Sequence, residues 1–298
     1  MKILQIGYPK SGNFWLYRIL QQLLETIGHN TKSFIQQHPV HSLAKTWELN
    51  FPNQADIDVI DITDLQTTYR ISSIFKMPVE NWETYLQKTN HVWTHSPVCK
   101  RTEGIFSLFD RKVYIIRDPR DVLLSASRYF CSDYMLKYFP QEETEPQAFL
   151  EKNFKELLQQ WVWHVWDHLR LQKKSNIHIC YFEGFLNDFQ REFDLLLDYL
   201  QLELNFEERT KLEEAVSFSH LQKKNPKHLK KGSHGQWTEG LTAGQKEKAE
   251  TITGPLLDYL GYGRENMEEK FNFRRSFSSE DAEKLKKEII ASQEILFS

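Results

Sequence analysis

Apolar residues along this chain recur with two different spacings, and the two spacings alternate. Short apolar runs are typical of strands, whereas apolar residues three or four positions apart are typical of a helix that packs on one face. Strands are predicted at residues 3–7, 91–94, 113–116 and 177–182, and helices at 13–27, 149–172, 185–200 and 280–297. Another helix is expected to begin at Asp118-Pro119, because proline suits a first helical turn. This alternation predicts an α/β fold with a central, mostly parallel β-sheet flanked by helices.

Two stretches depart from this pattern. Residues 223–240 carry five lysines and three glycines without apolar periodicity, which predicts a basic loop. After Gly263 the chain turns polar and then ends in the predicted helix. The apolar positions of that helix suit docking on the rest of the chain; they are Ala282, Leu285, Ile289 and Leu296. We therefore expect a main domain over residues 1–263 and a C-terminal extension over 264–298 that ends in a helix.

Composition narrows the choice of partners and compartment. A chain of 298 residues, 40% of them hydrophobic, can bury one large core. The net charge of −3 gives no general attraction for nucleic acid or a membrane, so anion binding has to be local. No apolar run approaches the roughly 18 residues of a membrane span, and residues 1–7 predict a strand instead of a signal peptide. Three widely spaced cysteines offer no zinc motif and no disulfide framework, which favours a reducing compartment; we expect a cytoplasmic protein.

The segment that begins at Gly7 joins the first predicted strand to the first predicted helix. Backbone amides in such a turn, together with the helix N-terminus, form a concave anion site. The spacing Gly7-x4-Gly12 is half of a nucleotide P-loop. The other half is missing, because Asn13 and Phe14 stand where a P-loop has its lysine and its Mg²⁺-binding hydroxyl, and the lysine lies inside the loop as Lys10. The loop therefore predicts phosphate binding without a metal, which argues against an ATPase or kinase. The alternative is an ordinary corner whose glycines serve packing.

Four segments combine charged residues, glycine or tyrosine at or near the ends of predicted elements. They are Tyr8-Pro-Lys-Ser-Gly-x-x-Trp15, Arg117-Asp-Pro-Arg-Asp-Val-Leu-Leu-Ser125, Tyr181-Phe-Glu183 and Lys230-Lys-Gly-Ser-His-Gly-Gln-Trp237. In this order they resemble four motifs of the cytosolic-type sulfotransferases that use 3′-phosphoadenosine 5′-phosphosulfate (PAPS): the 5′-phosphosulfate loop, the 3′-phosphate motif, the end of a core strand and a C-terminal basic motif. The resemblance extends from residue 3 to about 262. It implies that the chain is a sulfotransferase, with PAPS as co-substrate and no metal.

The resemblance also implies which residues bind the nucleotide. They are Lys10, Ser11, Gly12, Asn13, Phe14, Trp15, Arg117, Ser125, Tyr181, Phe218, Lys230, Lys231 and Gly232. The loop around Lys10 would hold the 5′-phosphosulfate, and Trp15 and Phe218 would stack on the adenine. Arg117 and Ser125 would bind the 3′-phosphate together with the basic loop, because an arginine fork can bind phosphate through two hydrogen bonds. Lys230 stands where the family usually has arginine.

The resemblance assigns catalysis to His95 and Lys10. His95 ends a predicted strand in the position of the family's general base, and a neutral imidazole can take the acceptor's proton. Lys10 would neutralise charge that develops on the leaving phosphate. His164 resembles a family residue on the acceptor side, although it suits a core position equally.

Several alternatives remain open at this point. Trp15 also suits core packing, and the charged residues from Arg117 to Asp121 also suit a surface cluster. Phe14 replaces a threonine of the family, and Trp93 replaces a lysine, so polar contacts near the reacting group are lost. These departures leave two hypotheses: an active sulfotransferase, or a catalytically impaired protein of the same fold that binds the nucleotide. The acceptor can be any small molecule, glycan or lipid with a hydroxyl or amine, and the sequence does not indicate an oligomeric state.

Overall fold

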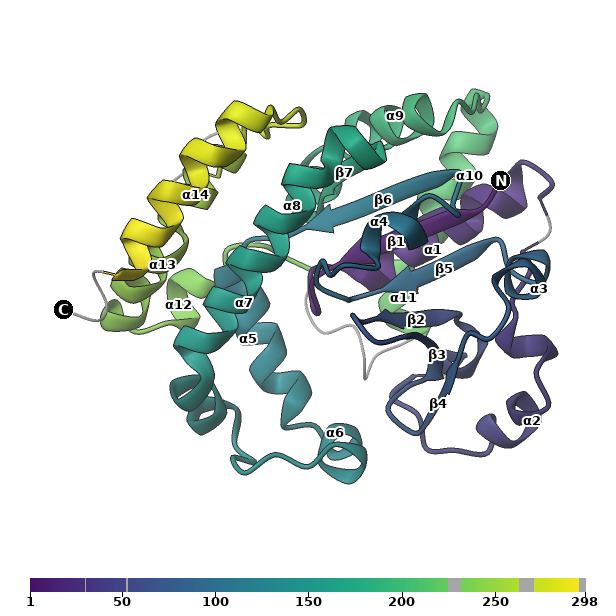
Figure 1. Cartoon of the computed structure of the whole chain (residues 1–298), viewed down its shortest axis with the longest axis horizontal. Coiled ribbons are helices and arrows are strands. Elements are labelled where there is room, and N and C mark those ends of the chain that lie inside the picture. Colours follow the sequence, from purple (N-terminus) through teal and green to yellow (C-terminus); the bar gives the residue numbers. More distant parts are fainter. Residues whose placement is uncertain (30, 52, 225–231, 263–270, 295–298) are drawn as a thin grey trace.

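The computed structural model describes residues 1–29, 31–51, 53–224, 232–262 and 271–294. Its centre is a seven-stranded sheet (Figure 1). The strands lie in the order β4 (Phe75–Pro78), β3 (Thr67–Ile71), β2 (Val59–Ile62), β5 (His91–Thr94), β1 (Ile3–Gly7), β6 (Arg111–Ile116) and β7 (Ile177–Tyr181). Strands β2, β5, β1, β6 and β7 run parallel, while β3 and β4 are antiparallel additions at one edge. The mostly parallel α/β sheet predicted from the sequence is confirmed.

The central strands are buried on both faces. In β6, Val113 and Ile115 pack with the core that α1 and α9 cover, whereas Tyr114 and Ile116 pack with the core under α7 and α13. This division follows from the strand itself, because successive side chains point to opposite faces. A strand covered on both faces has no polar side, which explains why these segments appear in the sequence as continuous apolar runs.

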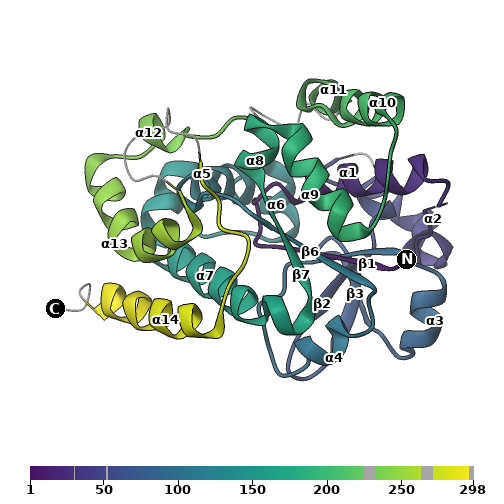
Figure 2. The ribbon, with the colours of Figure 1, turned by 90° about the horizontal axis from the view of Figure 1, so that it is seen from above.

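The helices connect the strands and flank the sheet (Figures 1 and 2). The longer ones are α1 (Asn13–Thr26), α5 (Pro119–Phe130), α7 (Pro146–Ser175), α9 (Phe189–Leu200), α10 (Phe206–Val216), α13 (Ala243–Leu260) and α14 (Ser279–Glu294). The short ones are α2 (Val40–Ala44), α3 (Trp82–Gln87), α4 (Thr102–Phe106), α6 (Asp133–Tyr138), α8 (Phe182–Asn187), α11 (Phe218–Lys224) and α12 (Trp237–Gly240). Across the described segments, no helix is long and apolar enough to cross a membrane.

Two expectations about local structure were wrong in detail. The single helix predicted over 185–200 is two helices, α8 and α9, because Asp188 leaves the helical conformation (φ −151°, ψ 79°) and its side chain accepts a hydrogen bond from the amide of Arg191 as a cap. The predicted basic loop begins later than expected, since Lys223 and Lys224 belong to α11, and it ends earlier, where α12 starts. Residues 225–231 of that loop lie outside the described residues.

The C-terminal segment packs along the main domain. Figure 2 shows α14, in yellow, beside α13 and α7. Ala282, Leu285 and Ile289 are buried as expected, while Leu296 lies outside the described residues. Ahead of α14, the guanidinium of Arg275 pairs with the buried carboxylate of Glu192 on α9. The proposed domain boundary at residue 263 also falls outside the described residues, so it stays a prediction.

Candidate functional site

Three adjacent parallel strands bring the predicted site together. Lys10 follows β1, His95 follows β5 and Arg117 follows β6, and the strands are neighbours in the order β5–β1–β6. Ligands of open α/β sheets bind at the carboxyl ends of the strands, where the connecting loops meet. The residues singled out on three distant motifs therefore lie at one edge of the sheet.

The loop between β1 and α1 is held in a tight, strained shape. Lys10 has φ 69°, a left-handed conformation that is uncommon for a residue with a side chain. Gly12 has φ 91°, and a Cβ there would lie 2.4 Å from the Phe182 ring, so only glycine fits. The side-chain amide of Asn13 closes the loop, because its Nδ2 donates to the carbonyl of Tyr8 at 2.7 Å. These contacts fix the loop before any ligand binds.

The interior of this loop presents donors that have no partner. The hydroxyl of Ser11 is fully buried without a hydrogen bond. Nothing among the described residues accepts from the backbone amides of Gly12 and Asn13, which begin α1. Buried polar groups without partners cost about 1–3 kcal/mol each. Their convergence at a helix N-terminus is what an anion such as phosphate or sulfate satisfies.

Arg117 lies across the loop from these donors. Its guanidinium donates to the carbonyls of Lys10 and Ser233, both at 3.3 Å, and it stacks on the Phe182 ring at 4.3 Å. Its Nε is buried and has no hydrogen-bond partner in the described part of the chain. The nearest acid, Asp121, is 3.9 Å away. Arg117 thus has donor capacity left for a ligand.

Asp121 ties the C-terminal motif to this edge of the sheet. Its buried carboxylate accepts from the backbone amides of Gly235 at 2.7 Å and Trp237 at 3.0 Å. Burial raises the pKa of Asp121, while Arg117 opposes that shift. These bonds bring Gly232 and Ser233 next to Arg117, although the motif lies more than a hundred residues away in the sequence.

The surface-cluster alternative for residues 117–121 is wrong. Arg117, Asp118, Arg120 and Asp121 are all at least nine-tenths buried. Arg120 makes a bidentate pair with Asp118 and stacks on Trp237 at 3.8 Å. This segment is therefore part of the internal framework of the site.

The site carries an excess of positive charge. The Nζ of Lys10 lies 4.1 Å from the centre of the Tyr129 ring, and no carboxylate among the described residues pairs with it. Burial, and to a lesser extent the neighbouring Arg117 and Arg128, lower the pKa of Lys10 to about 8. Arg128 on α5 has its own pKa lowered, chiefly by burial and also by Arg117. Cations that repel one another at a strained loop indicate a site for an anion.

His95 has a defined orientation beside the loop that carries Lys10. Its Nδ1 lies 2.5 Å from the carbonyl of Gly7. A carbonyl only accepts, so Nδ1 carries the proton and Nε2 keeps its lone pair. The pKa of His95 is lowered to about 4, chiefly by burial and slightly by Arg70 and Lys10, while the bond to Gly7 opposes the shift. The imidazole is therefore neutral at pH 7.

Three other predicted residues are placed in different surroundings. Trp15 is 5% exposed, and its indole N–H donates to the carbonyl of Val216 at 2.8 Å within the core. Tyr181 is fully buried, its ring stacks on Phe273 and its hydroxyl donates to the carbonyl of Arg274. Ser125 is partly buried on α5, two turns after Arg117. Adenine stacking by Trp15 and nucleotide contacts by Tyr181 and Ser125 stay predictions.

The remaining predicted residues can be placed only in part. Lys230 and Lys231 lie outside the described residues, and so does the side chain of Phe218. Gly232 has φ 44° beside Ser233, whose carbonyl Arg117 contacts. Sequence reasoning missed Arg128, whose only signal is its place three residues after Ser125 on the same helix.

The two departures from the family pattern meet in one apolar cluster. Phe14 packs edge-on against Phe51 with ring centres 4.8 Å apart, and Trp93 packs against the same cluster. The Trp93 ring also lies 5.2 Å from the ring of His95. Where the family has a threonine and a lysine, this chain thus has two aromatic rings of one cluster, and one of them, Trp93, packs against His95.

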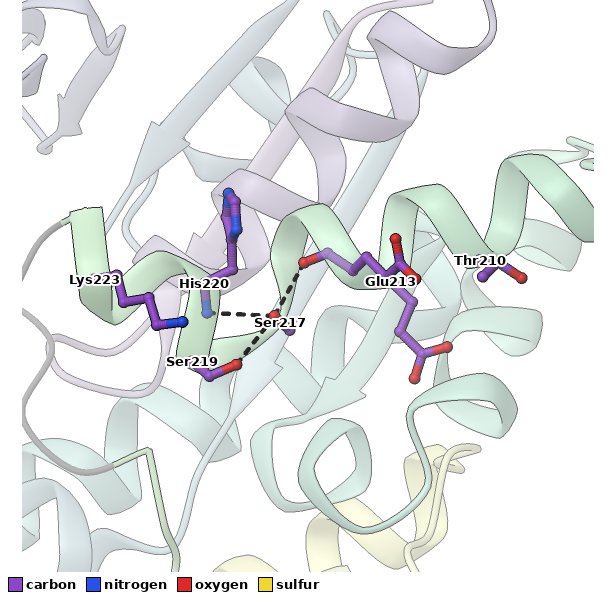
Figure 3. A pocket seen from close by; sticks show the side chains of 7 residues that line it. Thr210, Glu213, Ser217, Ser219, His220 and Lys223 are labelled. Carbon is purple, nitrogen blue, oxygen red and sulfur yellow. Dashed lines mark hydrogen bonds between the residues drawn. The ribbon is translucent and has the colours of Figure 1, made fainter.

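A surface pocket of about 480 Å³ lies on α10 and α11. Figure 3 shows its lining, which is Thr210, Glu213, Glu214, Ser217, Ser219, His220 and Lys223. None of these residues belongs to the cationic site, and most are exposed. For metals, the described part of the chain contains no group of three or more acidic, histidine or cysteine side chains arranged to hold an ion.

Fold and site together define an α/β protein with a candidate site for an anionic, phosphate-like group at the ends of parallel strands. The Sulfotransferase domain family matches this chain over residues 1–270. Mouse Sulfotransferase 2A1 is 23% identical over 265 residues, covering 84% of this chain and 82% of the relative. The guinea pig (Cavia porcellus) 3-beta-hydroxysteroid sulfotransferase is 24% identical over 266 residues, covering 83% and 80%. The crystal structure of mouse sulfotransferase SULT7A1 complexed with PAP aligns with a TM-score of 0.54 at 18% identity, covering 85% and 82%.

This chain belongs to the sulfotransferase family. It is a PAPS-dependent enzyme, and PAPS is its co-substrate; the expectations for family, fold, activity and co-substrate are confirmed.

Proposed function

We propose that this sulfotransferase moves a sulfuryl group from PAPS to a hydroxyl or amine of a small-molecule acceptor, with His95 as general base and Lys10 stabilising the leaving phosphate. One observation supports this most: Lys10, which has no described carboxylate partner, and the partly unsatisfied Arg117 meet at a loop of unsatisfied donors, and the neutral His95 contacts the carbonyl of Gly7 at the start of the same loop. A structural charge cluster would be neutralised by its own carboxylates.

In this proposal the loop holds the 5′-phosphosulfate. The hydroxyl of Ser11 and the amides of Gly12 and Asn13 donate to its oxygens, and Lys10 supplies the positive charge. Donors that are already in place need no reorganisation when charge develops, which is why such groups are worth roughly 3–4 kcal/mol each in a transition state. The strained φ of Lys10 is consistent with a loop shaped for this purpose.

Arg117 and the C-terminal motif hold the 3′-phosphate. The free Nε of Arg117 and the nearby Gly232 are the described parts of this site, and Ser125, Lys230 and Lys231 are assigned to it by the family resemblance. Asp121 positions the motif through Gly235 and Trp237, so it supports the site without contacting an anion.

His95 performs the proton transfer. Its Nε2 accepts the proton from the acceptor's hydroxyl or amine as the acceptor's oxygen or nitrogen bonds to sulfur. The bond between sulfur and the bridging phosphate oxygen breaks, and Lys10 neutralises the charge left on that oxygen. The negative charge of the bound phosphosulfate raises the pKa of His95 from its low ligand-free value, which makes it a better base when the substrates are present.

The acceptor and the compartment are assigned more broadly. The guinea pig relative is named for 3-beta-hydroxysteroids, and the rings of Phe14, Phe51 and Trp93 beside His95 suit an acceptor with an apolar body. The cysteines Cys99, Cys131 and Cys180 are free thiols, which fits the proposed cytoplasmic location.

The test compares two nucleotides and one variant. PAP should stabilise the protein by about 2.7 kcal/mol at a hundredfold excess over Kd, and adenosine 5′-phosphate much less, because it lacks the 3′-phosphate. His95→Ala should lose roughly 10²–10⁴-fold in turnover while PAP affinity barely changes. Calorimetry and PAP release from PAPS measure these effects. Equal stabilisation by both nucleotides would refute the 3′-phosphate site, and full turnover by His95→Ala would refute the base.

A further inference from the structure

A chain of buried hydrogen bonds lies behind His95. The hydroxyl of Tyr114 on β6 lies 2.9 Å from Nδ1 of His164 on α7, and Nε2 of His164 lies 3.3 Å from the backbone carbonyl of His95. Tyr114 is fully buried and His164 is 4% exposed. Three elements of the fold thus meet through polar contacts where apolar side chains would pack at lower cost.

The contacts determine where each proton lies. The carbonyl of His95 only accepts, so Nε2 of His164 is protonated and donates to it. Burial lowers the pKa of His164 well below its ordinary value, so the ring is neutral and its Nδ1 is an acceptor. The hydroxyl of Tyr114 therefore donates to Nδ1, and by doing so it selects the tautomer of His164 that can reach His95.

His95 is consequently held at two points. The main chain is held by His164 from the α7 side of the sheet, and the ring is held by the carbonyl of Gly7 in β1. The imidazole ring of His95 is therefore fixed at Nδ1, by its hydrogen bond, and at its own backbone. With both points fixed, its Nε2 can point in only one direction. If either attachment is lost, the ring can rotate away from the acceptor.

We propose that His164, oriented by Tyr114, is a positioning residue for the general base His95. This rests on the proposed role of His95, and it adds a requirement for two buried residues behind the histidine. A misplacement of about 1 Å at a reacting group can cost roughly 100-fold in rate. His164 thus controls the rate constant for proton transfer without changing nucleotide binding.

His168 provides a matched control. It is fully buried one turn further along α7, its ring stacks on Tyr114 at 4.8 Å, and its Nδ1 donates to the carbonyl of His164 at 2.7 Å. Within the described segments its Nε2 has no hydrogen-bond partner, and no hydrogen bond or ring contact joins it to His95. Substitution of His168 disturbs the same core without touching the hydrogen bonds that position the base.

The experiment compares His164→Gln with His164→Asn. The amide nitrogen of glutamine reaches about as far as Nε2 and can still donate to the carbonyl of His95, whereas asparagine reaches only as far as Nδ1. Turnover should fall about tenfold or more in His164→Asn and in the milder Tyr114→Phe, and His164→Gln should recover most of it. PAP affinity and the acceptor KM should change little in any of them, and His168→Gln should keep nearly full turnover.

A second readout does not depend on activity. Histidine ¹⁵N shifts of the ligand-free protein should show a single neutral Nδ1–H tautomer for His95 in the natural chain and in His164→Gln. The same spectrum should show mixed tautomers in His164→Asn and Tyr114→Phe. Equal turnover losses in His164→Gln, His164→Asn and His168→Gln would mean that the core is only structural and would overturn the proposal. Unchanged turnover and tautomer in His164→Asn would overturn it as well, whereas a fully active His95→Ala would instead remove the role of His95 on which it rests.

Discussion

Lys10→Met should make the ligand-free protein more stable while it removes most of its activity. Lys10 has no carboxylate partner among the described residues, and its pKa is about 8 instead of 10.5, first through burial and then through Arg117 and Arg128. A pKa lowered by this amount means that the charged form is disfavoured in the folded state by about 3 kcal/mol at pH 7. The contact with Tyr129 returns roughly 0.5–2 kcal/mol. Methionine keeps the unbranched apolar stem of the lysine, so the free energy of unfolding should rise by about 1–2 kcal/mol in Lys10→Met.

The pH dependence gives this prediction its sign. Below pH 8 the lysine is charged in both the folded and the unfolded chain, so the penalty is fully present. Between pH 8 and 10.5 the folded protein loses the proton first, and above 10.5 neither state is charged. The stability difference between Lys10→Met and the natural protein should therefore shrink as the pH rises from about 8 to 10.5.

The assay is denaturant unfolding without nucleotide at several pH values, paired with turnover of PAPS. Lys211→Met is the control, because Lys211 is exposed and paired with Glu207 on its own helix; it should change stability by less than about 0.5 kcal/mol. Turnover of Lys10→Met should fall by roughly 10²–10³-fold. If Lys10→Met is instead less stable than the natural protein at pH 7, Lys10 has an attractive structural partner and is not held for a ligand.

Three further predictions follow from the same geometry. Arg117→Lys should weaken PAP binding by about 1.5–3 kcal/mol, roughly 10- to 150-fold, with little effect on the binding of adenosine 5′-phosphate. Calorimetry measures both affinities, and Arg170→Lys is the surface control. Equal losses of affinity for the two ligands would contradict a 3′-phosphate contact. Trp93→Lys should leave turnover flat or lower, because the ring that packs against His95, the proposed general base, is lost. If the natural protein is inactive with every acceptor and gains activity from this change, it is instead a decayed enzyme. Arg275→Met should cost about 3–5 kcal/mol in urea unfolding, because it leaves the 2%-exposed carboxylate of Glu192 without its cation. The added change Glu192→Gln should recover much of that loss, and a cost below about 1 kcal/mol would show that the C-terminal segment contributes little to the fold.

Sequence reasoning located the candidate site because its key residues follow strands directly. Lys10, His95 and Arg117 each come within three residues of the end of a predicted parallel strand, and parallel strands have their carboxyl ends at one edge of the sheet. Strand β2 and the two strands added antiparallel to it, β3 and β4, were not predicted. They are short and lie at or near an edge, and most of β4 is exposed, so their apolar pattern is weak.

Long-range packing separated residues that the motifs had grouped together. Trp15 lies inside the nucleotide loop motif, yet its indole is bonded to Val216, 201 residues away, within the core. Tyr181 ends a core strand as expected, but Phe273 from the C-terminal segment covers it. Neither partner is visible from the local sequence, because burial depends on which distant segments pack together.

The sequence by itself determined the α/β class, the family and the loop that can hold an anion without a P-loop metal ligand, since each depends on residue type and spacing over a few positions. Only the tertiary structure decided that Lys10 has no carboxylate partner among the residues it describes, that Asp121 binds the amide of Gly235 and so brings the C-terminal motif to Arg117, and that His164 donates to the backbone carbonyl of His95. These are properties of charge, burial and hydrogen-bond direction between segments far apart in the chain, so they exist only once the sheet has brought the strand ends together.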